Sequence, residues 1–155
     1  MTQIRQANRS DAARLNRALA RLSRDLSDTH RATDAQIEAA LAGQRPIARA
    51  LLAEDGDDVT GLAFYSPGFS TARGGAWVYV SDLWVCDSRR GKGLGRRLLR
   101  AVMQDASSVW NARWLKLFVY DHRPETRAFY ENLGFVPTTN QSELSISAET
   151  LRGPT

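Results

Sequence analysis

A basic, glycine-rich loop between a strand-like run and a helix-like run constrains the fold of this chain more than any other feature. The loop, residues 90–95, reads RGKGLG. Residues 76–85 before it, AWVYVSDLWV, are rich in the aromatic and β-branched side chains that favour strands. After it, apolar residues recur at helical spacing: Leu94, Leu98, Leu99, Val102, Met103 and Ala106. Glycines at a helix N-terminus let backbone amides converge where the helix dipole is positive, so the pattern predicts an anion site.

Basic side chains surround this loop, and they indicate which kind of anion it binds. The cations are Arg89, Arg90, Lys92, Arg96, Arg97 and Arg100. Cations near a helix N-terminus oppose its dipole, and a bound pyrophosphate would offset them. The spacing G-x-G-x-G differs from the G-x-G-x-x-G of dinucleotide sites, and the Gly-Lys-Ser/Thr ending of nucleoside-triphosphate loops is missing.

A second motif follows about thirty residues later. Residues 114–120, WLKLFVY, predict a strand, and a helix carrying Phe129, Tyr130 and Leu133 is expected to end at Gly134. Together, the loop pattern Arg90-x-x-Gly93-x-Gly95 and the run AFYENLGF at 128–135 resemble two signatures of the GNAT N-acetyltransferase superfamily, in matching order and spacing. The resemblance extends from residue 59 to 135 and is nearest to the small-amine and polyamine branch.

The resemblance implies a mixed α/β layer fold in a single domain over residues 1–155. Its twisted, mostly antiparallel sheet has a central bulged strand and carries helices on both faces. The local patterns agree with this order. They predict an edge strand at 4–6, helices at 10–26 and 33–43, a hairpin of strands 49–54 and 59–65, a loop at 66–75 and a last strand at 144–146.

The resemblance also implies acetyl-CoA as cosubstrate, with no metal. The free backbone of Leu83, Trp84 and Val85, where the central strand splays from its neighbour at a bulge, would hold the pantetheine arm and direct an N–H at the thioester oxygen. Backbone amides of the loop would hold the diphosphate. These residues are Arg90, Gly91, Lys92, Gly93, Leu94, Gly95 and Arg96.

Two residues are candidates for proton transfer. Tyr130 matches the tyrosine that protonates the leaving thiolate in many members, and a phenol of pKa about 10 suits a thiol near 8.5. Asp82, before the predicted bulge, would accept a proton from the amine or attract a cationic acceptor. Structural alternatives are a core aromatic for Tyr130 and a hydrogen-bonded strand carboxylate for Asp82. His30 borders the expected acceptor site or lies on the surface.

Two residues fall outside the pattern. Many members place an asparagine before the second helix, where this chain has Arg123, which carries no hydrogen-bond acceptor. The only cysteine, Cys86, lacks a disulfide partner and a zinc-binding neighbourhood, so it is expected to be a small, partly buried residue.

The acceptor is expected to be a small-molecule primary amine. Asp25, Asp28, Asp34 and Asp82 would suit a cation, while amino acids, aminoglycosides and protein N-termini or lysines stay open. Alternatives are a non-catalytic acetyl-CoA-binding regulatory module and a protein acetyltransferase. Nucleic-acid binding is disfavoured, because the cations gather at one loop instead of spreading along a face with aromatics.

Composition fits a cytoplasmic protein without a membrane segment. The formal net charge is +4, and neither a leader nor an apolar run of bilayer length is expected. The resemblance alone leaves a homodimer open.

Overall fold

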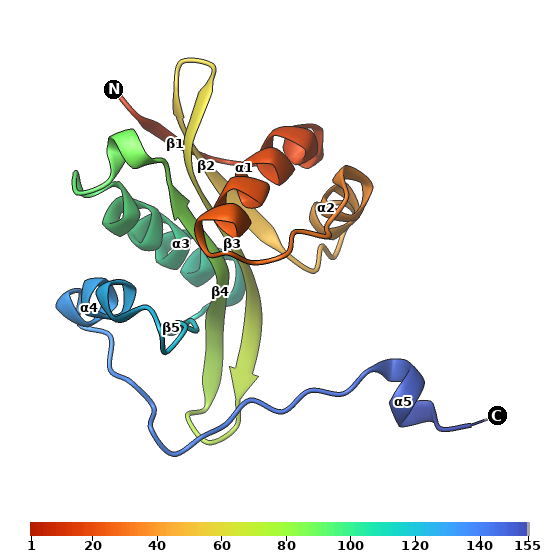
Figure 1. The fold of residues 1–155 in the computed structure, drawn as a ribbon. Helices are drawn as coiled ribbons and strands as arrows, with labels where there is room; N and C mark the ends of the chain where they lie inside the picture. Colours follow the sequence, from red (N-terminus) through yellow and green to blue (C-terminus); the bar gives the residue numbers. More distant parts are fainter. Residues whose placement is uncertain (155) are drawn as a thin grey trace. The chain divides into compact units, whose positions relative to one another are not determined.

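The structure, a computed structural model, describes residues 1–154, which form two compact units, Met1–Phe118 and the residues from Val119 onward. A five-stranded sheet of order β1-β2-β3-β4-β5 forms the first unit (Figure 1). Strands β1 to β4 pair antiparallel with one another, and β5 runs parallel to β4. The strands are β1 Gln3–Gln6, β2 Arg49–Asp55, β3 Asp58–Ser70, β4 Gly75–Val85 and β5 Trp114–Lys116. The mostly antiparallel sheet is thereby confirmed, whereas the single domain over 1–155 stays a prediction.

Helices cover both faces of this sheet (Figure 1). Leu62 of β3 lies in one hydrophobic core with Leu15 of α1 and Ile37 of α2. The preceding residue, Gly61, instead approaches Leu98 of α3. Since adjacent strand residues point to opposite faces, α3 lies on the face opposite α1 and α2. The helices are α1 Ala12–Asp25, α2 Asp34–Leu41 and α3 Leu94–Trp110, with a 3₁₀ turn, η1, at Arg9–Asp11.

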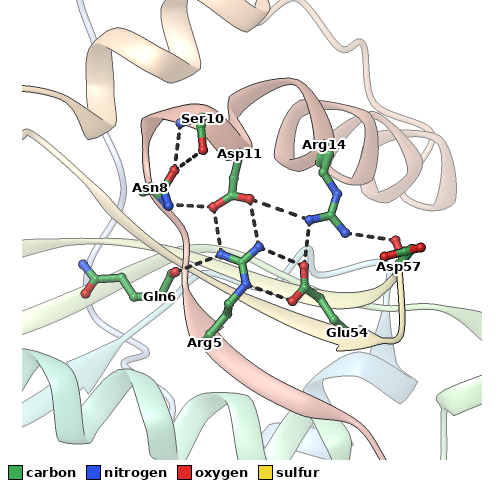
Figure 2. Close-up of polar contacts among 8 residues, drawn as sticks. All are labelled: Arg5, Gln6, Asn8, Ser10, Asp11, Arg14, Glu54 and Asp57. Carbon is green, nitrogen blue, oxygen red and sulfur yellow. Dashed lines mark hydrogen bonds and ion pairs between the residues drawn. The ribbon is translucent and has the colours of Figure 1, made fainter.

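An ion-pair cluster joins β1, β2 and the start of α1 (Figure 2). The Arg5 guanidinium donates to Asp11 at 2.8 Å and 2.9 Å and to Glu54 at 2.9 Å. Arg14 adds a bond of 2.7 Å to Glu54. The Asp11 carboxylate also accepts the Asn8 amide at 2.9 Å, so the predicted helix start at Ser10 is a capped 3₁₀ turn and α1 begins after it. These bonds, the Arg5 bonds first, lower the pKa of the buried Asp11 to about 2.

Asp11→Asn is therefore expected to lower the free energy of unfolding by about 2 kcal/mol at neutral pH. Because the folded-state pKa lies below that of the unfolded chain, the carboxylate stabilises the fold above about pH 4 and loses this effect as the pH falls toward 2. Urea unfolding at pH 7 and pH 3 measures it, with Asp57→Asn on the exposed hairpin as control. An equal difference between wild type and Asp11→Asn at both pH values would contradict the assignment.

A β-bulge in β4 reverses the alternation of its side chains. Val80 pairs with Tyr65 and Asp82 pairs with Phe64, which leaves Ser81 as the extra residue. The Tyr65 hydroxyl bonds to α3, while Phe64 packs against the α1 core. Paired residues share a face, so Val80 points toward α3 and Asp82 points toward α1.

The predicted loop at 66–75 is wrong, because β3 continues to Ser70 and the turn occupies only 71–74. Gly68 and Pro67 favoured a loop in the sequence, yet both lie in the β3–β4 ladder. A Cβ at Gly68 would clash with the ring of Trp77, its cross-strand partner. The glycine therefore makes room for an indole instead of ending a strand.

The second unit contains α4 Pro124–Asn132 and α5 Ala148–Arg152. Gly134 follows α4 with φ +102°, and its amide bonds to the carbonyl of Glu131 at 3.0 Å. The Phe135 amide bonds to the Tyr130 carbonyl at 3.1 Å, which completes a Schellman motif and confirms the helix end predicted at Gly134. The strand predicted at 144–146 is wrong: this segment is irregular and its side chains are exposed. The strand predicted at 114–120 is also shorter, ending at Lys116.

Candidate functional site

The glycine loop presents unpaired backbone amides at the start of α3. Gly91 and Gly93 have φ values of +71° and +82°, a left-handed conformation that glycine adopts without strain. Gly93 is the N-cap of α3, so no side chain caps the helix, and its first turn carries no acidic residue. The first-turn amides of Leu94, Gly95 and Arg96 have no intrahelical acceptor. The geometry suits an anion with several oxygens.

Carboxylates, however, offset part of the positive charge around the loop. Arg89 pairs with Asp55 at 2.5 Å, and Arg90 pairs with Asp25 at 2.7 Å and Asp87 at 2.6 Å. These two arginines therefore have carboxylate partners within the protein, and their offset by a bound anion stays a prediction. The remaining cations around the loop form no ion pair within residues 1–154; they are Lys92, Arg96, Arg97 and Arg100.

The C-terminal half of β4 has an open edge within the first unit. The strand β5 pairs only with residues 77–79 of β4, and no other strand in Met1–Phe118 pairs with the same edge beyond them, although the Arg90 side chain bonds to the Val85 carbonyl there at 2.9 Å. The Cys86 amide bonds to the Thr60 carbonyl of the β3 segment at 2.9 Å. Because residues of an antiparallel strand direct their backbone groups alternately to either side, Leu83 and Val85 direct theirs to the open edge and Trp84 toward β3. The three residues predicted to offer free backbone groups, Leu83, Trp84 and Val85, therefore do not all face the open edge, and the bulge lies before them.

The Trp84 side chain is part of the core under α1 and is 3% exposed. Its indole N–H donates to the Asp25 carboxylate at 3.0 Å, and the Arg21 guanidinium lies 4.6 Å from the ring centroid. Asp25, expected to attract a cationic acceptor, therefore bonds to two residues of the cofactor-side segment, Trp84 and Arg90.

Asp82 and His30 lie on the α1 side and interact electrostatically. Burial raises the pKa of Asp82, while a hydrogen bond of 2.7 Å from the Ser81 hydroxyl and the charge of His30 act in the opposite direction. The His30 ring lies between Ser23 and Asn16, at 3.2 Å and 2.8 Å. This brings two predicted acceptor-site residues, Asp82 and His30, to one face of the sheet.

The orientation of Asn16 places a proton on Nε2 of His30. The Asn16 side-chain amide nitrogen donates to Asp34 at 2.8 Å and to the Ala32 carbonyl at 3.1 Å. The amide oxygen therefore faces His30 Nε2, which must carry a proton to donate to it. Asp34, one of the predicted acceptor carboxylates, is bonded within this network, and Asp28 lies in the exposed segment between α1 and α2.

Tyr130 lies on α4 in the second unit. Its ring makes T-shaped contacts with Phe129 and Phe135, with centroids 5.0 Å and 5.3 Å apart. Burial raises the pKa of its phenol to about 12. Arg123 is the N-cap residue of α4 and forms no side-chain cap bond.

The contacts of two residues in the site region could not be predicted from the sequence. Ser81 carries no motif, yet it forms the bulge, and its hydroxyl also donates to the Phe64 carbonyl at 3.1 Å. Tyr65 is fully buried, and its hydroxyl donates to Asp105 of α3 at 2.6 Å. Local patterns give no signal for either contact, because both depend on strand register.

Residues 1–154 contain no group of three or more His, Cys, Asp or Glu side chains placed to hold a metal ion. Over the same range, no helix has the length and hydrophobicity needed to span a bilayer. Cys86 is buried, with its sulfur 3.3 Å from the Ser88 hydroxyl.

The layered sheet, the open β4 edge and the glycine loop agree with the fold and cofactor loop expected of an acyltransferase. The chain belongs to the acetyltransferase (GNAT) family, whose profile matches residues 15–135. It is 32% identical over 142 residues to the uncharacterized N-acetyltransferase YhfO of Bacillus subtilis, covering 88% of this chain and 91% of that protein. It is 27% identical over 141 residues to the thialysine N-epsilon-acetyltransferase of Bos taurus, covering 84% and 82%. The fold matches an integron cassette protein of Vibrio cholerae with a TM-score of 0.77 at 20% identity, covering 97% of this chain and 95% of that one.

Proposed function

We propose that this acyltransferase moves an acetyl group from acetyl-CoA to a primary amine, by direct attack in a ternary complex. The observation that carries the proposal is the uncapped start of α3, where two left-handed glycines leave first-turn amides free to bind a diphosphate. Bound acetyl-CoA would supply the activated acetyl thioester. The protein would bind, orient and exchange protons.

The proposed cofactor contacts are mostly backbone groups. The amides of residues 91–96 would hold the diphosphate, whereas the Arg90 amide is already bonded to the Asp87 carbonyl at 3.2 Å. At the open edge of β4, the backbone of Leu83 and the N–H of Val85 would hold the pantetheine arm and polarise the thioester carbonyl, while the Val85 carbonyl accepts the Arg90 side chain at 2.9 Å. Trp84 would support this segment through its buried ring.

Asp82 is the proposed proton acceptor, or the partner of a cationic amine. Its burial on the α1 side raises its pKa toward the range in which a carboxylate is an effective general base. If the carboxylate form is required, the rate falls as the pH drops through this raised pKa. The pH–rate profile of Asp82→Asn would then lack that acidic limb.

Tyr130 is the proposed proton donor. A phenol with a pKa of about 12 keeps its proton throughout the neutral range. Transfer to a thiolate whose conjugate acid has a pKa of about 8.5 requires close contact during departure of the leaving group.

The proposed acceptor is a small cationic amine. Asp82, with the His30 network beside it, provides the polar groups on the α1 side, and the bovine relative is named for acetylating the ε-amine of thialysine. An amine presented by a protein is the competing acceptor.

Thermal unfolding with and without acetyl-CoA, followed by thiol release against a panel of amines, tests the function. Ligand at a hundred times its Kd should add about 2.7 kcal/mol to stability. A shift together with thiol release supports the proposal and identifies the acceptor class. A shift without release from any amine or peptide supports a non-catalytic binding module instead, and no shift contradicts the cofactor site.

A further inference from the structure

One guanidinium connects three parts of the first unit at the entrance to the glycine loop. Arg90 donates from Nε to the Val85 carbonyl at 2.9 Å and from Nη2 to Asp25 at 2.7 Å, and its Nη1 lies 2.6 Å from Asp87. The Trp84 indole donates to the same Asp25 oxygen at 3.0 Å. We call these five residues, Asp25, Trp84, Val85, Asp87 and Arg90, the Arg90 clamp.

The clamp determines how the chain leaves β4. It connects the last residue of α1, the last residue of β4 and the 3₁₀ turn η2, Asp87–Arg89. Although half of the Arg90 side chain is exposed, all three of its nitrogens have acceptors within the protein, so the planar group has one preferred position. The loop amides begin at the next residue, Gly91, and their direction therefore depends on the clamp.

We infer that Arg90 is a positioning residue that aims the loop amides, and that Asp25 anchors it and does not contact the acceptor. This inference rests on the proposed function, because it concerns the same acetyl-CoA site. It assigns diphosphate binding to the amides and to the cations without carboxylate partners, such as Lys92. It also connects the cofactor loop to α1, the helix that bears the His30 network.

Asp25→Asn and Arg90→Lys separate positioning from direct contact. Asparagine keeps an acceptor for the Trp84 indole but loses the charge that holds Arg90, and lysine keeps the charge but lacks the three-way geometry. Each variant is expected to weaken acetyl-CoA binding about tenfold, as measured by calorimetry. The double variant should be little weaker than either single one, because both break the same contact.

Steady-state kinetics provide the readout that distinguishes the two roles of Asp25. In Asp25→Asn, KM for acetyl-CoA should rise about tenfold, while KM for the amine stays within about twofold of wild type. A raised amine KM with unchanged acetyl-CoA KM would overturn the inference in favour of an acceptor contact. Unchanged or tighter acetyl-CoA binding in Asp25→Asn would also overturn it, since a freed Arg90 would then be a phosphate ligand.

Three controls complete the experiment. Lys92→Gln removes a cation, so it should weaken acetyl-CoA binding and make that binding less dependent on salt concentration. Arg90→Lys keeps the charge and should leave the salt dependence unchanged. Circular dichroism checks that each variant is folded, and Asp87→Asn, which loses only one of the three contacts, should give a smaller change in the same direction. If wild type fails to bind acetyl-CoA, the proposed function is wrong. If wild type binds and the clamp variants bind equally well, only this inference is wrong.

Discussion

Gly93→Glu is expected to weaken acetyl-CoA binding by about a hundredfold or more while leaving the protein folded. Gly93 is the N-cap of α3 with φ +82°, and a Cβ there would meet no atom within 4 Å. The space therefore accommodates a side chain, at a cost of about 1–2 kcal/mol for a non-glycine residue in this conformation. The introduced carboxylate would occupy the amides of the first turn and repel the diphosphate.

Calorimetric titration measures the loss, and two variants separate its causes. Gly93→Ala introduces the conformational strain without the charge, so it should retain more affinity than Gly93→Glu. Gly74→Glu places the same side chain in the β3–β4 turn, where φ is +68° and a Cβ also meets no atom within 4 Å. Gly74→Glu should bind like wild type, and full affinity in Gly93→Glu would show that the loop is not the diphosphate site.

Tyr130→Phe is expected to lower kcat by about ten- to a thousandfold with little change in the Kd for acetyl-CoA. Phenylalanine keeps the ring that contacts Phe129 and Phe135, so only the hydroxyl is lost. Thiol release measured at saturating amine reports the effect. An unchanged kcat would make Tyr130 a core residue, with the proton coming from elsewhere.

The pH dependence gives a second check on Tyr130. Its pKa of about 12 means that wild type should lose no activity through ionisation of this phenol at moderately alkaline pH. Tyr120→Phe, in the same unit, serves as the matched control and should leave kcat near wild type.

The sequence predicts well those elements whose signal is local. The α3 pattern, with Leu94, Leu98 and Val102 in the core, is confirmed, as is the Gly134 helix end. These features depend on residues within a turn or two of each other, and helical spacing or a left-handed glycine is enough to specify them.

Features that depend on partners distant in sequence could not be predicted. Gly68 resembles a loop residue until Trp77 is placed opposite it. The ion pair between Arg90 and Asp25 has no signal in the sequence, because the two residues are far apart along the chain. The alternation at 144–146 resembles a strand, but strand propensity expresses packing against a neighbour, and these side chains are exposed.

The extra residue, Ser81, divides β4 into two segments whose even-numbered side chains face opposite sides of the sheet. Side chains before it, such as Val78 and Val80, are buried against the α3 side, and the even-numbered positions after it, Asp82 and Trp84, serve the opposite layer. Deletion of Ser81 would restore regular alternation and leave Asp82 and Trp84 facing the α1 layer, whereas deletion of Leu83, after the bulge, would turn the Trp84 indole away from Asp25. The number of residues between the bulge and the end of β4 therefore decides whether the Trp84 indole reaches Asp25, and an insertion or deletion there should be less tolerated than most substitutions.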